Sequence, residues 1–407
     1  MIDNETSPPI PEAARPKGVE KRIWEGCKTI LINVIVFCSL FVSFEFSYRV
    51  WTYFRSCNPI CNITALKKLD AFEREHVYGF LASNRVTGFS PADGTFVIDE
   101  PGWNNVTITI RGGVRVNTNF APTSANGAIL AVGDSFVFGD QVSDGETWPA
   151  ILERRLNRRV VNGGVSNYGA AQAVLRAEQL LKAEPYTLVI LSILVGGDGG
   201  DLWRDRLVNG FVFYRPAVIR EGDKVRQTTI EESRKIVLDN FICDHPWIPE
   251  FFFWSYIARR FFLWLGYDGQ CFAIIHPKAA TENEILEFVI ERLARLPVNK
   301  AILIQYPSYS LKNTGEAANI YEAAIRNSID EARMIREVAN RHGVPVVDTY
   351  YVLKNKPLDK IYREPHHSKK GNEVVADLIA REIRGAPSPA PVTAKGAPGF
   401  SLSPVNP

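Results

Sequence analysis

The chain has 407 residues, of which 47 are basic and 45 acidic, so its formal net charge at pH 7 is only +2. A chain of this length can form two or three folding units with a sizeable core. No segment concentrates Lys and Arg beyond a few residues, so nothing indicates nucleic-acid binding. The composition, with 8 Trp and 23 Phe, is typical of an aromatic-rich globular protein.

The N-terminal part predicts a tail and a membrane anchor. We assign residues 1–28, which begin with a stretch rich in Pro, Glu and Lys, to a disordered cytoplasmic tail. Residues 29–48 are apolar with one charge, Glu45, and are just long enough to span a bilayer. Basic residues before this run favour a cytoplasmic N-terminus. A cleaved signal peptide is the alternative, but no small-residue cleavage pattern follows the run.

Residues 49–127 predict a small β-rich lead-in that packs on the main domain. Residues 106–110 alternate as strands do, and residues 96–98 form a short apolar run. Asp-Gly, Pro-Gly and Gly-Gly pairs around them are typical of turns.

From residue 128 onward, short apolar runs alternate with amphipathic stretches, which predicts a parallel sheet with helical crossovers. Strands are expected at residues 129–132, 159–162, 187–193, 300–305 and 345–348. Helices are expected at residues 148–157, 170–182, 316–342 and 371–384. This domain would comprise residues 128–201 and 281–384, followed by a disordered Pro/Ala/Gly tail at 385–407.

Residues 202–280 interrupt this alternation as an insertion. Its aromatic run at residues 251–265 contains Arg259 and Arg260. The run could be a lid or interfacial helix that meets a membrane or an acyl chain. The alternative is a packed helix of a small subdomain.

Four cysteines follow the apolar N-terminal run, and their even number fits an oxidising compartment. Cys57 with Cys61 could close a small loop, and Cys243 with Cys271 could link the ends of the insertion by a disulfide bond. Four free thiols are the alternative. Zinc is not indicated, because no Cys-x-x-Cys pair or neighbouring His cluster is present.

A Gly-Asp-Ser turn, residues 133–135, follows the first buried strand of this domain. A serine at the carboxyl end of such a strand lies where open α/β sheets bind ligands, so Ser135 is a candidate nucleophile. A nucleophilic serine needs a base, which need not be near it in sequence. His366 and His367, just before the last helix, are the candidates.

These motifs together resemble the SGNH (GDSL-type) hydrolases. Residues 133–139 resemble the family's block I, residues 161–172 its block II, and the His-x-Ser-x-x-Gly run at residues 366–371 its block V. The resemblance implies an SGNH, flavodoxin-like three-layer α/β/α fold, with Ser135 as nucleophile. It selects His366 as the base, because His367 lacks the family's spacing.

The resemblance to SGNH hydrolases also implies which residues serve as the acid and the oxyanion hole, although this sequence departs from the family's pattern at each of these positions. The family's aspartate three residues before the histidine is Arg363 here, so Glu364 is the expected acid, and a Ser–His dyad is the alternative. Asn167 stands where block II has the oxyanion-hole glycine, and Asn tolerates positive φ well. Gly197 stands where block III has an asparagine, and losing one oxyanion donor costs about a hundred- to a thousandfold in rate.

Asp134 and Asp198 complete the expected oxyanion and substrate-binding set. Either could instead be a metal ligand, but nothing nearby has the density of carboxylates that a divalent cation needs. We therefore expect no metal and no cofactor.

The resulting hypothesis is a serine esterase anchored by one span in a bacterial inner membrane, with its catalytic domain in the periplasm. Its substrates would be O-acetyl groups of cell-surface glycan or lipid acyl esters. One alternative is an O-acyltransferase that uses the same serine on a surface polysaccharide. The other is a non-catalytic glycan-binding or assembly protein, favoured by the missing block III asparagine.

Overall fold

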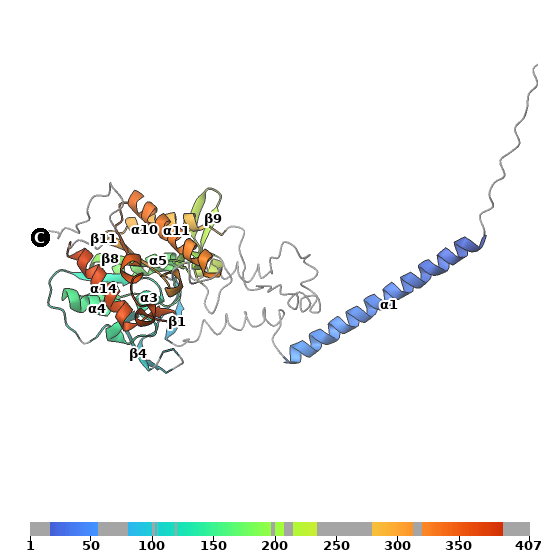
Figure 1. Ribbon diagram of the computed structural model, residues 1–407, viewed down its shortest axis with the longest axis horizontal. Coiled ribbons are helices and arrows are strands. Elements are labelled where there is room, and N and C mark those ends of the chain that lie inside the picture. Colours follow the sequence, from blue (N-terminus) through green and yellow to red (C-terminus); the bar gives the residue numbers. More distant parts are fainter. Residues whose placement is uncertain are drawn as a thin grey trace, which may run out of the picture. The chain divides into compact units, whose positions relative to one another are not determined.

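The computed structural model describes residues 17–55, 80–99, 102–103, 105–118, 120–196, 200–206, 215–233, 279–311 and 320–385 (Figure 1). The chain divides into two compact units: Met1–Ala65 with His245–Gly269, and Leu66–Asp244 with Gln270–Pro407. The aromatic run at 251–265 and the cysteines at 57, 61, 243 and 271 lie outside the described residues, so the lid and disulfide hypotheses concern undescribed parts.

The described part of the first unit is helix α1 (Lys17–Arg55), which contains the predicted apolar run. Within it, Trp24–Tyr48 is 25 residues long and has a mean hydropathy of 2.1. Among the described residues, this is the one helix long and apolar enough to cross a membrane, either as an anchor or as a signal sequence.

The second unit contains an eight-stranded sheet in the order β12-β11-β8-β6-β7-β5-β4-β3. The strands of this sheet are β3 (Gly94–Ile98), β4 (Val106–Arg111), β5 (Val114–Arg115), β6 (Ala128–Val132), β7 (Val160–Asn162), β8 (Tyr186–Leu194), β11 (Asn299–Gln305) and β12 (Val346–Asp348). Strands β7, β6, β8, β11 and β12 are parallel. When these five strands are numbered by their position in the sequence, their order across the sheet is 2-1-3-4-5, as in flavodoxin. In folds with this order the ligand site lies where the strand order reverses, which here is between β6 and β8.

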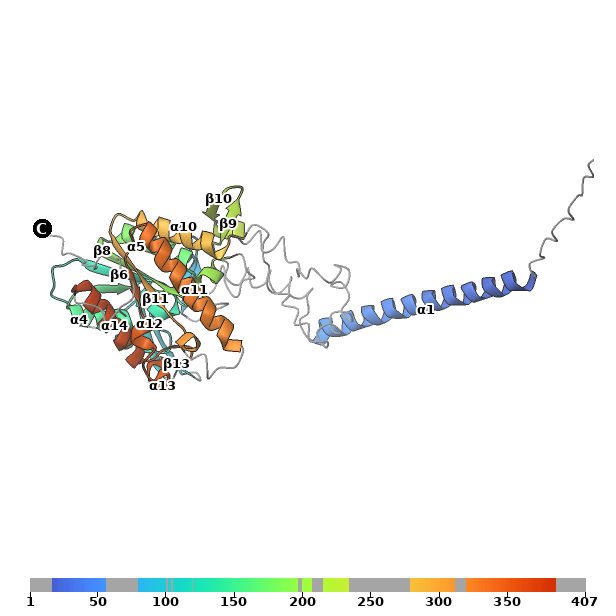
Figure 2. The same cartoon turned by 45° about the horizontal axis from the view of Figure 1, so that its top comes forward.

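Helices cover both faces of this sheet, which makes the fold a three-layer α/β/α sandwich (Figures 1 and 2). On one face lie α5 (Ala170–Ala183), α10 (Glu282–Ala294) and α11 (Ile320–Arg341). On the other lie α4 (Trp148–Leu156) and α14 (Lys369–Ile383). Strand β6 has no exposed face because its residues alternate between the two cores, and this explains its uninterrupted apolar sequence.

Smaller elements connect this framework. They are the hairpins β1 (Leu81–Asn84) with β2 (Gly88–Pro91), β9 (Val218–Glu221) with β10 (Lys224–Gln227), and β13 (Tyr362–Arg363) with β14 (His366–His367), and the short helices α3 (Ser135–Phe138), α6 (Asp201–Arg204), α12 (Tyr350–Leu353), α13 (Leu358–Ile361), η1 (Asp144–Glu146) and η3 (Ser308–Leu311).

The lead-in does more than pack on the main domain, because three of its strands extend the central sheet. Strands β3, β4 and β5 are antiparallel and join the edge of β7 through the pair Arg115 and Asn162. In β4 the side chains of Val106, Ile108 and Ile110 are buried against Phe138, which follows the candidate nucleophile. The lead-in therefore forms part of the wall behind the site.

Arg115 joins the lead-in to the loop that follows Ser135. Its side chain is 2% exposed, and its guanidinium donates to the carbonyl oxygens of Phe138 (2.7 Å), Gly139 (2.6 Å) and Val142 (2.6 Å). Its Nε also donates to Asp144 at 3.0 Å. One buried side chain thus fixes the backbone on both sides of residues 140–141.

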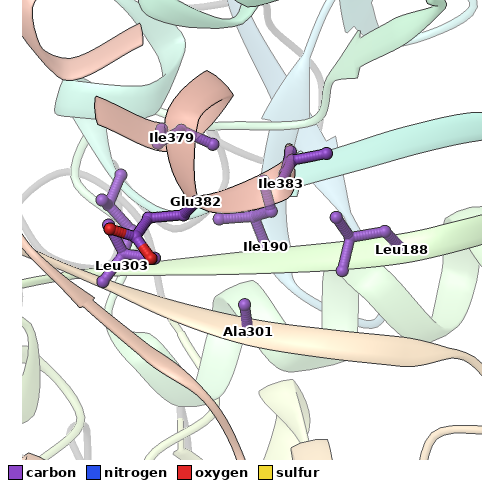
Figure 3. Close-up of a pocket in the computed structure, with 8 residues that line it drawn as sticks. Leu188, Ile190, Ala301, Leu303, Ile379, Glu382 and Ile383 are labelled. Atoms are coloured by element: carbon purple, nitrogen blue, oxygen red, sulfur yellow. The ribbon is translucent and has the colours of Figure 1, made fainter. Parts of the chain in front are cut away.

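An apolar pocket lies between the sheet and the end of α14 (Figure 3). Its lining residues are Leu188, Ile190, Ala301, Leu303, Val347, Ile379, Glu382 and Ile383. None of these is a candidate site residue, so we interpret the pocket as a gap in the packing of α14.

We expect Arg115→Met to lower the free energy of unfolding by about 3 kcal/mol, because it leaves buried carbonyl oxygens and Asp144 without their donor. Chemical denaturation of the detergent-solubilised protein measures this. The matched control is Arg155→Met, which breaks an exposed pair with Asp377 and should change stability by less than about 1 kcal/mol. Equal effects from both substitutions would contradict the role given to Arg115.

Candidate active site

Ser135 lies at the carboxyl end of β6, where the chain turns into α3. The turn needs glycine at position 133, because a Cβ there would lie 2.9 Å from the Ser192 carbonyl oxygen on β8 and 2.6 Å from Val137. Asp134 caps α3 by accepting from the Phe136 N–H at 2.9 Å. Ser135 is therefore the first helical residue beyond the strand, at the β6/β8 switch.

Asp134 belongs to a buried network beneath the nucleophile. Its second carboxylate oxygen lies 3.4 Å from Arg204 Nη1, which also donates to Asp201 at 2.8 Å and to the Tyr168 carbonyl at 3.2 Å. Burial raises the pKa of Asp134, and the Arg204 charge opposes this rise. Since Asp134 is fully buried and bonded on both oxygens, we assign it to the support of the turn rather than to substrate binding.

His366 reaches Ser135 from the other end of the chain. It lies on β14, which precedes α14, and its Nε2 is 2.9 Å from Ser135 Oγ. The imidazole packs on the Phe136 ring, with 5.3 Å between the ring centroids. The structure thus brings together two side chains that the sequence separates by more than two hundred positions.

Burial lowers the pKa of His366 to about 4, with Asp134 raising it and Arg204 lowering it. The imidazole is therefore neutral at pH 7 and can accept a proton from the serine hydroxyl.

The expected acid, Glu364, does not contact the imidazole nitrogen that an orienting acid would occupy. Its carboxylate accepts a hydrogen bond from Ser308 Oγ instead. The group at His366 Nδ1 is the side-chain amide of Gln141, with Oε1 at 3.0 Å. The structure therefore corrects the assignment of Glu364, whose side chain is directed to a neighbouring loop.

Asp140 is the second site residue that the sequence did not identify. Its Oδ2 lies 3.9 Å from His366 Nε2, and its Oδ1 accepts from Ser166 Oγ at 2.5 Å. Burial raises the pKa of Asp140 to about 6, while the Ser166 hydrogen bond lowers it. Asp140 and Gln141 directly follow block I, but nothing in the local sequence shows that they reach His366.

Block II is hydrogen-bonded to the residues on both sides of Ser135. Asn162 Nδ2 donates to the Val137 carbonyl at 2.9 Å, and the Val165 N–H donates to the Gly133 carbonyl at 3.0 Å. Asn167 has a φ of 70°, the left-handed conformation expected at this glycine-like position. No described residue accepts a hydrogen bond from the backbone N–H of Ser135, which leaves that group available to a developing oxyanion.

Block III is described only at its start, because Gly197 and Asp198 lie outside the described residues. The Gly196 N–H donates to Glu331 at 2.9 Å and is thereby engaged. Among the described residues, no group of three or more His, Cys, Asp or Glu side chains could hold a metal ion.

His367, next to the candidate base, is 2% exposed and packs between the rings of Phe136 and Tyr362. No described residue gives its ring nitrogens a hydrogen-bond partner. Burial lowers the pKa of His367 to about 3 in the folded protein, whereas in the unfolded chain the pKa is near the normal histidine value of 6.5. As the pH falls, the unfolded chain therefore binds a proton at His367 before the folded protein does. Stability is consequently lost as the pH falls below about 6.5.

We expect His367→Phe to remove this part of the acid sensitivity. Between about pH 7.5 and about pH 5.5, the free energy of unfolding should fall by about 1–1.5 kcal/mol less in the variant than in the wild-type protein. Urea unfolding followed by tryptophan fluorescence at the two pH values measures the difference. Equal losses in the two proteins would show that His367 is not held neutral.

No protein-family model and no curated protein matches this chain. Solved structures do. A carbohydrate acetylesterase family member from Sinorhizobium meliloti is 14% identical, with a TM-score of 0.31, over 63% of this chain and 97% of that one. An acetylxylan esterase from Geobacillus stearothermophilus is 16% identical, with a TM-score of 0.34, over 64% and 95%. A protein titled as a putative SGNH hydrolase, from Slackia heliotrinireducens, is also among the solved structures to which the chain is similar.

Proposed function

We propose that this chain is a serine esterase. The observation that carries the proposal is the 2.9 Å contact between Ser135 Oγ and Nε2 of the neutral, half-buried His366 at the β6/β8 switch. A hydroxyl and a base at this distance form the basic unit of nucleophilic ester cleavage. The motifs that resemble SGNH hydrolases place the same two residues in these roles.

Ester cleavage at this site follows from the groups present. Ser135 Oγ attacks the ester carbonyl while His366 Nε2 takes the hydroxyl proton. The carbonyl oxygen, which becomes negatively charged, accepts hydrogen bonds from the Ser135 and Asn167 N–H groups. His366 then gives its proton to the departing alcohol. In the second half of the reaction His366 deprotonates a water molecule that attacks the acyl carbonyl, and it returns this proton to Ser135 Oγ as the acyl–Oγ bond breaks and the acid leaves.

For the substrate we propose O-acetyl groups of cell-surface glycan or lipid acyl esters, because both are ester-linked and accessible to an enzyme held at a membrane. Release of acetate from an acetylated glycan in water distinguishes hydrolysis from transfer, which would require an added acceptor hydroxyl.

We further propose that α1 is an uncleaved anchor in a bacterial inner membrane, with the N-terminus in the cytoplasm and the catalytic unit in the periplasm. Two features support this. The apolar side chains of Trp24–Tyr48 are exposed all around the helix, as a lipid-facing helix requires. Lys21, Arg22 and Lys28 cluster at its N-terminal end, which favours a cytoplasmic location for that end.

We expect a fluorophosphonate probe to label the detergent-solubilised protein and to fail on Ser135→Ala. Hydrolysis of p-nitrophenyl acetate should fall at least about a thousandfold in the same variant, because the nucleophile is lost. Ser83→Ala, at an exposed serine on β1, is the matched control and should behave as the wild type. A folded wild-type protein that is neither labelled nor active would contradict the proposal.

We expect the full-length protein, expressed in a Gram-negative host, to stay in the membrane pellet after an alkaline carbonate wash. Protease added to spheroplasts should digest the catalytic unit and leave an N-terminal cytoplasmic tag intact. Release as a shorter soluble protein would instead identify α1 as a cleaved signal sequence.

A further inference from the structure

Gln141 occupies a conformation that is rare for its residue type. Its φ is 66°, in the left-handed region that favours glycine, and only 6% of its surface is exposed. Such a conformation persists only where the surrounding structure enforces it, and it is concentrated at functional sites. The side chain of Gln141 lies at His366 Nδ1, on the opposite side of the imidazole from Ser135.

The hydrogen bonds of Gln141 fix the orientation of its amide. Its Nε2 lies 3.1 Å from the backbone carbonyl of Glu364, which can only accept, so the NH₂ group must face that carbonyl. The amide oxygen Oε1 therefore faces His366 Nδ1 at 3.0 Å. Because this oxygen can only accept, Nδ1 must carry the imidazole proton.

These hydrogen bonds also determine whether His366 Nε2 carries a proton. In a neutral imidazole only one nitrogen is protonated, so His366 Nε2 presents its lone pair to Ser135 Oγ. This is the tautomer that a general base requires. We propose that Gln141 is the positioning residue that orients His366 and selects its tautomer, in place of the carboxylate that serves this purpose in most Ser–His sites.

The proposal rests on the proposed esterase function and on a loop that is held rigidly. Arg115 fixes the carbonyls of Gly139 and Val142 on either side of the loop, and Arg363 Nη1 donates to the Gln141 carbonyl at 2.9 Å. Gly102 lies against the amide, because a Cβ there would come within 3.3 Å of Gln141 Nε2.

The carboxylates near His366 do not take this position. Asp140 lies on the Nε2 side of the ring, and the Glu364 carboxylate is bonded to Ser308. The charged and titratable groups that face the imidazole are Asp134, Asp140, Arg204, Glu364 and His367. Since the group at Nδ1 is a neutral amide, a carboxylate placed there would add new stabilisation of the imidazolium.

The test compares Gln141→Leu and Gln141→Glu in the full-length, detergent-solubilised protein. Gln141→Leu removes the acceptor, so kcat for p-nitrophenyl acetate and the rate of fluorophosphonate labelling should fall about ten- to a thousandfold, with KM changed less than about threefold. Gln141→Glu keeps the acceptor and adds a charge, so the acid limb of the kcat/KM profile should move up by about 1–3 pH units.

Gln179→Leu is the matched control, because it makes the same substitution at a half-buried position of α5 away from the site, and it should change neither quantity. An unchanged kcat in a folded Gln141→Leu protein would overturn the proposal. An unshifted profile in Gln141→Glu would also overturn it, and this second variant keeps the test decisive if Gln141→Leu fails to fold.

Nitrogen NMR of ¹⁵N-histidine-labelled protein separates this proposal from the proposed function. The wild type should show His366 protonated at Nδ1, and Gln141→Leu should show a tautomer mixture, whether or not any ester is cleaved. Loss of the Nδ1 preference without wild-type turnover would support the positioning role and refute the esterase. An Nδ1 preference that survives in Gln141→Leu would refute the positioning role alone.

Discussion

The geometry around His366 depends on the hydrogen bonds that the buried guanidinium of Arg115 donates to the backbone. It comes from β5, outside the parallel strands, and it bonds the backbone between Phe138 and Val142. That short stretch contains Asp140 and Gln141, both of which approach the imidazole of His366. Without these hydrogen bonds, the loop that carries Asp140 and Gln141 would lack the support that keeps both side chains near the imidazole. The antiparallel strands therefore help to hold the base in place, although the residues that contact the imidazole come from the parallel domain.

Sequence reasoning recovered the features that have local signals. The five parallel strands were predicted as short apolar runs, and the turn at Ser135 and the histidine before α14 were found from their motifs. Helix α10 was missed, although Thr281 and Glu284 form a capping box at its start and an apolar stripe follows. The role of Gln141 could not be predicted, because its contact to His366 joins positions 225 residues apart and depends on a left-handed backbone that no motif announces. Glu364 was chosen for its closeness in sequence, whereas the backbone of β13 and β14 directs its side chain towards Ser308.

A network of buried ionic groups connects three turns of the site through Arg204. Arg204 bonds Asp134 after β6, the Tyr168 carbonyl within block II, and Asp201, which in turn accepts from the Leu194 N–H at the end of β8. Burial raises the pKa of Asp201 well above its usual value, with the neighbouring Asp134 charge adding to the effect. Such networks contribute little net stability, because desolvation offsets much of the attraction. Their value here is geometric, since one cation sets the relative positions of three turns.

The pairing of β5 with β7 also has a consequence for how the chain acquires its structure. The β3–β4 hairpin is local and leaves the ribosome before any parallel strand, yet its partner edge forms only when residues 160–162 arrive. Until then an apolar ribbon with unpaired backbone groups is presented to its surroundings, a state that favours aggregation. A truncated polypeptide that started at residue 128 would carry the opposite liability, an uncovered β7 edge. A fragment that keeps the β7 edge paired must therefore include the antiparallel strands as well as the catalytic motifs.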